Sequence, residues 1–160
     1  MEFQKIKLHR SEKNRAAVTQ ITLDDDYNVP DYRQDIVNVI KERGELRFDE
    51  VKAMEGAAWI KGSLVFKVLY RSDKQEGKIS CLRGEIPFQE RLNMDGLSEY
   101  DAVHATGDME DLTIGVINSR KLNVRAVIVL TASSEKEVDE ELTCELSDGS
   151  SYEQNIVEKE

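Results

Sequence analysis

Apolar residues recur with a two-residue period along most of the chain, the period of a β-strand whose side chains alternate between two faces. Two runs, Ala57 to Arg71 and Lys121 to Ala132, carry apolar residues on both faces, which predicts long central strands covered on one side and half covered on the other. One face of the first run holds Ile60, Leu64, Phe66, Val68 and Tyr70, and one face of the second holds Leu122, Val124, Ala126, Ile128 and Leu130.

Shorter alternating runs predict further strands, separated by turn signals such as Glu55-Gly56, Ser72 through Gly77 and Asp95-Gly96. These strands are expected at Thr19 to Leu23, Glu45 to Met54, Lys78 to Phe88, Ala102 to Met109 and Thr113 to Ile117. Many strands joined by tight turns favour a mainly β fold, an antiparallel β-sandwich or an open barrel.

One short helix is expected near the N-terminus, in the segment NVPDYRQDIVNVIKERG that starts at Asn28. Pro30 suits the first turn of a helix, and Ile36, Val37 and Ile40 recur on one side of it. Gly44 is placed to end the helix after about three turns.

The chain divides by composition into a β-rich domain over residues 1–132 and an acidic tail over residues 133–160. The tail offers one further strand around Glu141 to Leu146 and otherwise resembles a linker. Because the chain begins with Met1 and ends in this acidic stretch without a closing element, we expect it to be the leading piece of a longer, multi-module protein.

The net charge of −10 disfavours nucleic-acid phosphates and anionic lipid surfaces as partners. The N-terminal stretch lacks the apolar region of a signal peptide, and no apolar run approaches the ~20 residues of a membrane-spanning helix. Membrane insertion is therefore not expected. The two cysteines, Cys81 and Cys144, lie far apart and are expected to be reduced thiols.

Motifs for catalysis or cofactor binding are missing from the sequence. No glycine-rich phosphate loop and no GxSxG nucleophile elbow occurs, and His9, His104 and the cysteines lack the spacing of zinc ligands. We therefore expect no catalytic, cofactor-binding or metal-binding residues, and no enzyme activity.

Asp24, Asp26 and Asn28 match the first three ligand positions of a calcium-binding loop, and Asp35 falls at the twelfth. Val29 stands where such a loop needs a glycine, and Asp35 is shorter than the usual bidentate glutamate. The triplet is better explained as a solvated turn that precedes the helix, although ion binding there is left open.

Three other groups have a chemical and a structural interpretation. Asp101 and Asp108 could orient the imidazole of His104 for acid–base work, but the three do not all share a strand face and no nucleophile accompanies them. Glu110-Asp111 is better explained as the polar start of a loop, and Trp59 as a core residue instead of a stacking platform.

Three stretches together resemble the SPOCS domain of endospore-forming Firmicutes. They are VPDYRQDIVNVI (Val29 to Ile40), IKGSLVFKVLY (Ile60 to Tyr70) with the later IPF of Ile86 to Phe88, and INSRKLNVRAVIVL (Ile117 to Leu130). Their order resembles the amino-terminal region of SipL-like spore-coat proteins, which carry SPOCS modules followed by a LysM domain. No LysM segment is present here.

The resemblance implies a non-catalytic, structural protein-interaction module in endospore coat or envelope assembly. It would act in the mother-cell cytoplasm at the forespore surface, with spore-coat morphogenetic proteins, and further SPOCS modules, as partners. The alternative is a cell-wall-associated β-sandwich that binds a carbohydrate or another small ligand. Neither the contact surface nor the oligomeric state follows from the sequence.

Overall fold

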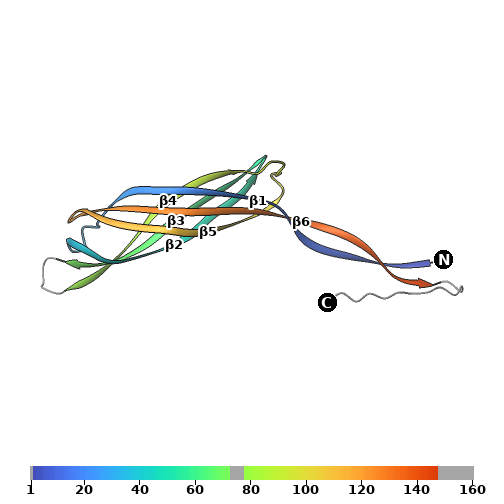
Figure 1. The fold of residues 1–160 in the computed structure, drawn as a ribbon, viewed down its shortest axis with the longest axis horizontal. Helices are drawn as coiled ribbons and strands as arrows, with labels where there is room; N and C mark the ends of the chain where they lie inside the picture. The colour runs from blue at the N-terminus through green and yellow to red at the C-terminus, as the bar shows by residue number, and fades with distance from the viewer. Residues whose placement is uncertain (1, 73–77, 148–160) are drawn as a thin grey trace. The chain divides into compact units, whose positions relative to one another are not determined.

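Six long strands account for most of the computed structural model, which describes residues 2–72 and 78–147 (Figure 1). The strands are β1 (Glu2–Asn28), β2 (Ile36–Met54), β3 (Ala57–Ser72), β4 (Ile79–Asn93), β5 (Ala102–Asn118) and β6 (Lys121–Ser147). The chain divides into a larger unit, Lys13–Lys136, and a smaller unit that combines Met1–Glu12 with Glu137–Glu160. Both β1 and β6 contribute to each unit.

The larger unit is a β-sandwich of two three-stranded sheets. One sheet has the order β2-β3-β4 and the other the order β1-β6-β5, so β3 and β6 are the central strands. The mainly β fold and the two long central strands expected from the apolar pattern are thereby confirmed. Strand β2 also contacts β5 at one side of the sandwich, which brings the two sheets close to a barrel-like closure there.

The pairing between strands is regular in one ladder and interrupted by register shifts in two others. Strands β3 and β4 pair without a shift from Ala57 opposite Asn93 to Arg71 opposite Ile79. The β2–β3 ladder contains three register shifts and the β5–β6 ladder two. The short strands predicted at Ala102 to Met109 and Thr113 to Ile117, expected to be separate, are the two halves of β5. They are joined across the register shift that follows Met109.

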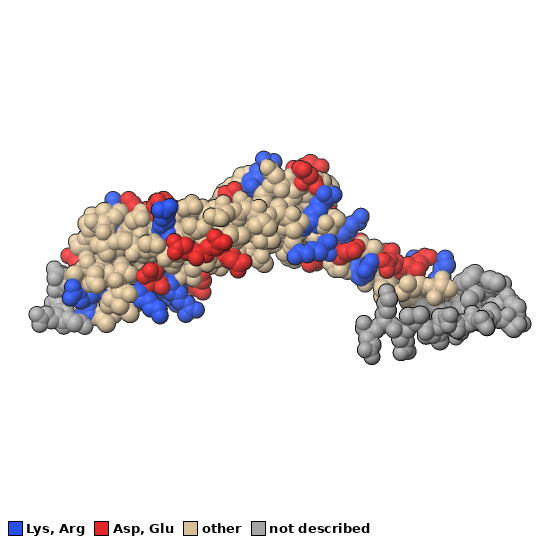
Figure 2. Space-filling view, in the orientation of Figure 1, with Lys and Arg blue, Asp and Glu red and all other residues tan. Residues whose placement is uncertain are grey.

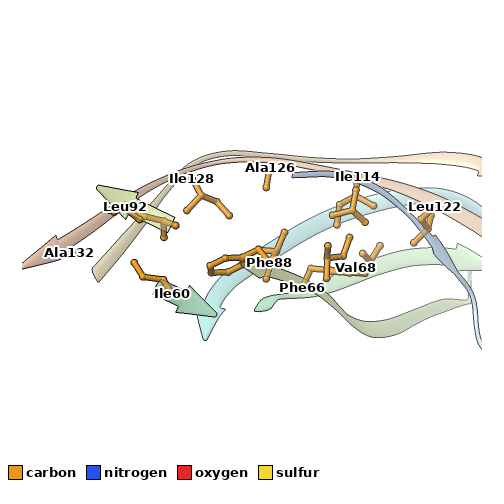
Figure 3. Packing of buried hydrophobic residues seen from close by; sticks show 14 of the residues in the cluster. Ile60, Phe66, Val68, Phe88, Leu92, Ile114, Leu122, Ala126, Ile128 and Ala132 are labelled. Atoms are coloured by element: carbon orange, nitrogen blue, oxygen red, sulfur yellow. The ribbon is translucent and has the colours of Figure 1, made fainter. Parts of the chain in front are cut away.

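Apolar side chains from both sheets meet in a closed core (Figure 3). The residues predicted to share one face of each central strand are fully buried, including Phe66 from β3 and Ile128 from β6. Figure 3 shows side chains of β3 and β4 facing those of β5 and β6 across the sandwich. Alternation along the strands therefore assigned the core faces correctly.

Gly84 on β4 makes room for an aromatic contact inside the sandwich. A Cβ atom at Gly84 would lie 2.3 Å from Cζ of Phe66, which pairs with it across the ladder, and 2.8 Å from Cε2 of Tyr27. The Tyr27 and Phe66 rings meet edge to face with centroids 5.1 Å apart. A glycine inside a strand often marks such a close approach. Burial raises the pKa of the Tyr27 phenol above its ordinary value.

The prediction of a short helix in the segment that contains Pro30 is wrong. Residues 29–35 form a turn-containing loop, and the residues from Ile36 onward are the start of β2. Ile36 is buried opposite Ser72, whereas Val37 and Ile40 lie exposed at register shifts of the ladder. β-Branched residues favour a strand once a partner is available, and β3 supplies sixteen residues of partner.

The smaller unit joins basic residues near the N-terminus to acidic residues of the predicted tail. The Lys5 Nζ atom lies 3.2 Å from Glu141 Oε2, and Arg10 Nη2 lies 2.5 Å from Glu140 Oε1. The further strand expected around Glu141 to Leu146 is present as the end of β6. The domain limit at residue 132 and the linker role of the tail stay predictions.

Candidate interaction surfaces

The outer face of the β2-β3-β4 sheet, which points away from the core, concentrates positive charge. We call this surface the basic face. By strand register it carries nine exposed cations: Lys41, Arg43, Arg47, Lys52, Lys61, Lys67, Arg71, Arg83 and Arg91. Its carboxylates are Glu45, Asp49, Glu50 and Glu85. Nine cations minus four carboxylates leave a formal charge of +5 on one face of a chain whose net charge is −10.

Arg47 ties the two outer strands of this sheet together across β3. Its Nη1 and Nη2 atoms donate to the two carboxylate oxygens of Glu85 on β4 at 2.9 and 3.2 Å, and its Nε donates to Asp49 at 2.9 Å. The hydrogen bond from Arg47 is the main reason why the pKa of Glu85 lies below its ordinary value. The forked geometry of the guanidinium allows this bidentate contact.

A second group of cations on the basic face makes a single, long ion pair within the described residues. Arg43, Lys67 and Arg83 lie side by side in one row across the three strands, and only Arg83 approaches a carboxylate, Glu85 at 3.8 Å. Figure 2 shows Lys and Arg side chains at the lower left of the view, with Asp and Glu side chains beside them. Like charges directly opposite each other destabilise a sheet. The row therefore places three like charges side by side on the surface of the sheet.

Exposed apolar side chains lie beside this row. Leu69 is 36% exposed on β3, next to Cys81 on β4, and Ile79 is 54% exposed at the start of β4. The surface of this sheet thus combines neighbouring cations with exposed apolar groups.

Trp59 lies half-buried at the other end of the basic face. The prediction that it is a core residue is therefore wrong. It lines a shallow hollow together with Lys52, Met54, Lys61 and two further residues, Glu50 and Gln89. Because consecutive residues of a strand point to opposite faces, the side chain of Trp59 points outward while that of the next residue, Ile60, is buried in the core. The aromatic ring thus helps form the floor of a surface depression.

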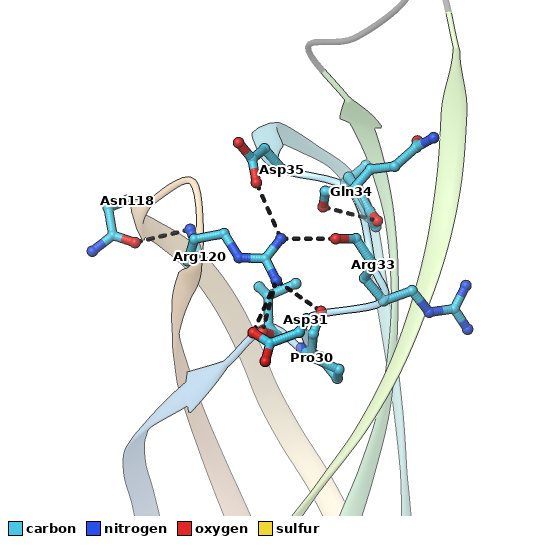
Figure 4. Close-up of polar contacts among 9 residues, drawn as sticks. Pro30, Asp31, Arg33, Gln34, Asp35, Asn118 and Arg120 are labelled. Carbon is cyan, nitrogen blue, oxygen red and sulfur yellow. Dashed lines mark hydrogen bonds and ion pairs between the residues drawn. The ribbon is translucent and has the colours of Figure 1, made fainter.

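Arg120, in the turn between β5 and β6, holds the 29–35 loop (Figure 4). Its Nη1 donates to the Arg33 carbonyl at 2.8 Å and to Asp35 Oδ1 at 3.1 Å. Its Nη2 donates to the carbonyls of Pro30 at 2.8 Å and Val29 at 3.2 Å. We call this contact the Arg120 clamp. No local sequence pattern points to it, because the partners of Arg120 lie about 90 positions away.

The clamped loop presents an aromatic side chain to solvent. Tyr32 is 81% exposed at its tip, with the Arg33 guanidinium 5.5 Å from the ring centroid. Backbone hydrogen bonds reinforce the clamp: Val29 N–H donates to the Arg120 carbonyl, and Ile36 N–H donates to the Ser119 carbonyl, both at 2.9 Å. Tyr32 is therefore held on an ordered loop.

The acidic triplet lies within β1 and not in a turn, so the turn interpretation was wrong. Asp24 and Asp26 both accept hydrogen bonds from the Asn123 side-chain amide, at 2.9 and 3.2 Å. Asp35, considered as a twelfth ligand, binds Arg120 instead. In the part of the chain that the structure describes, no three His, Cys, Asp or Glu residues cluster in a way that could hold a metal ion.

The remaining candidates are dispersed. His104 is exposed on β5 with Nε2 3.9 Å from Glu135 Oε2, while Asp101 accepts a hydrogen bond from Ser98 N–H in the preceding turn. Glu110 and Asp111 occupy a register shift inside β5 instead of a loop. His9 contacts Asp139 in the smaller unit. Cys81 is a free, exposed thiol, and Cys144 lies on β6.

The fold defines a β-sandwich domain in which the outer face of one sheet carries net positive charge. A family model described as "SipL, SPOCS domain" matches residues 35–117, slightly more than half of the 160 residues. The chain therefore belongs to the SipL SPOCS domain family, a sporulation-related family. No curated protein and no solved structure matches it. Over residues 2–72 and 78–147, no helix is long and apolar enough to span a membrane.

Proposed function

We propose that this chain is a non-catalytic interaction module of endospore coat or envelope assembly, which binds acidic surfaces of coat-morphogenetic proteins through the basic face. The observation that carries the proposal is the row of Arg43, Lys67 and Arg83 with Leu69 beside it. Such a row opposes sheet stability and is compensated when an acidic partner covers it. Membership of the SPOCS family supports the setting in sporulation.

A capture experiment from sporulating cells tests this function. The bait is the whole 160-residue chain, and its Arg43→Glu/Lys67→Glu/Arg83→Glu variant reverses the row. Coat-morphogenetic proteins, identified by mass spectrometry, should be retained by the original chain and reduced about tenfold or more by the variant, since like-charge contacts strongly disfavour binding.

The matched control reverses three exposed cations that lie off the basic face, Lys13, Arg125 and Lys136. It changes the net charge by the same amount, so capture should persist. If both variants lose capture equally, net charge and not the basic face decides binding. If the bait retains no coat protein, the proposed function is wrong.

The mother-cell cytoplasm at the forespore surface is the proposed place of action. A fluorescent fusion of the chain should accumulate around the forespore during sporulation, and the triple charge reversal should spread it through the mother cell. A uniform distribution of the unaltered fusion would contradict this location.

The hollow at Trp59 favours a second candidate, a small-ligand or carbohydrate site. An aromatic side chain beside Glu50 and Gln89 offers an apolar face on which a sugar ring can stack. Because Trp59 is the single tryptophan of the chain, its fluorescence reports on this hollow directly. Saturable quenching by soluble cell-wall glycan fragments would favour this candidate over the interaction module, and an unchanged spectrum would reject it.

A further inference from the structure

The outer face of the second sheet, β1-β6-β5, carries charge of the opposite sign. We call this surface the acidic face. Five carboxylates lie on it by strand alternation and contact: Asp24, Asp26, Asp108, Asp111 and Glu135. Two cations, Lys121 and Arg125, share it. Within residues 13–136 the two outer faces of one sandwich therefore differ in sign, +5 on one and −3, five carboxylates less two cations, on the other.

The centre of the acidic face is uncharged. Val127, Val129 and Thr131 run along β6 on this outer face and are half-buried. Asp111 and Asp108 stand opposite the two valines on β5. An apolar strip beside carboxylates complements the basic face, where Leu69 lies beside the row of three cations.

We propose that the basic face of one copy of this chain docks on the acidic face of a second copy. This inference rests on the proposed function and names a partner for its basic face. Charge complementarity selects the occupant: a surface of matching size and opposite sign is present on every copy. Two different faces meet in this contact, so it is heterologous and leaves a free face at each end, which allows copies to add in a row.

The available area suits such a contact. Sixteen residues of β3 at ~3.3 Å each, and three strands about 4.8 Å apart, give the basic face roughly 760 Å². Standard interfaces bury about 800 Å² per partner. The association should weaken as salt rises, because the Debye length falls from ~10 Å at 0.1 M to ~3 Å at 1 M.

Two charge-reversed variants test the contact by complementation. The first reverses the basic face through Arg43→Glu, Lys67→Glu and Arg83→Glu. The second reverses the acidic face through Asp108→Lys and Asp111→Lys. Each variant presents two faces of like sign and should fail to associate with itself. Mixed in equal amounts they again offer opposite faces and should associate.

Sedimentation velocity of the whole chain measures the result. The unaltered chain should self-associate at low salt and dissociate in about 1 M salt. Each variant alone should associate at least about tenfold more weakly, and the mixture should recover. A control with Glu55→Lys and Glu99→Lys, two exposed turn residues, should behave like the unaltered chain.

Two outcomes would overturn the inference: an unaltered chain that stays monomeric at low salt, or variants that do not recover on mixing. Circular dichroism of each variant confirms that it is folded before the comparison. If the chain stays monomeric but still captures coat-morphogenetic proteins, self-docking is wrong and the proposed function stands. If the chain self-associates but captures no coat-morphogenetic protein, only the proposed function is wrong.

Discussion

Replacing Arg120 with alanine should destabilise the larger unit by removing the Arg120 clamp. The guanidinium donates to three carbonyls and one carboxylate, and its side chain is 36% exposed. A hydrogen bond contributes about 0.5–1.5 kcal/mol net, and the lower part of this range applies to a partly exposed site. Four such bonds give about 2–4 kcal/mol.

Thermal unfolding and amide exchange measure this effect. For a unit of this size, 1 kcal/mol moves Tm by about 4 °C, so Arg120→Ala should lower it by about 8–16 °C. The Val29 and Ile36 amides, which donate to the turn that contains Arg120, should exchange faster with solvent. Faster exchange at these two positions with little change in Tm would show that the loop opens locally.

Two substitutions control the interpretation. Arg120→Lys keeps the charge but lacks the planar fork, so it should recover only part of the lost stability. Arg125→Ala removes an exposed cation from β6 and should change stability by less than about 0.5 kcal/mol. If Arg120→Ala changes neither Tm nor the two exchange rates, the clamp does not hold the loop.

Three further predictions concern the core, an ion pair and the acidic triplet. Phe66→Ala and Ile128→Ala should each cost about 2–5 kcal/mol in urea unfolding, and an unchanged midpoint for either would contradict its burial. The lowered pKa of Glu85 means that its ion pair stabilises the fold above the ordinary carboxyl pKa and is lost as pH falls through the folded-state value. Stability of the unaltered chain should therefore decline more steeply below about pH 4 than that of Glu85→Gln; coincident Tm profiles between pH 3 and 6 would refute this. Millimolar calcium should leave Tm unchanged both in the unaltered chain and after combined substitution of Asp24, Asp26 and Asn28, whereas a rise confined to the unaltered chain would reveal a site.

The strand alternation was sufficient to predict the class of fold and the orientation of its two central strands. Alternate residues of a strand point to opposite faces, so burial of one face imposes a two-residue period that is local in the sequence. Phe66 and Ile128 were assigned to the core in this way. The same logic failed for Trp59, because a strand with apolar residues on both faces does not reveal which side is open to solvent.

The tertiary structure decided between helix and strand for residues 36–43. Ile36, Val37 and Ile40 fit one side of a helix as well as an irregular strand, and a local pattern of this length cannot separate the two. Pairing with β3 favours the strand over the helix, because Ile36 gains a buried position opposite Ser72. That gain depends on residues more than thirty positions away.

The candidate surfaces also arise only in three dimensions. Arg43, Lys67 and Arg83 come from three strands, and only the register of two ladders places them in one row. Arg120 reaches the 29–35 loop across some 90 residues because the β5–β6 turn and the β1–β2 loop lie at the same end of the sandwich. Alternation along the two central strands was enough to identify the residues that fill the core. Their neighbours depend on strand pairing, whose hydrogen bonds join segments far apart in the chain.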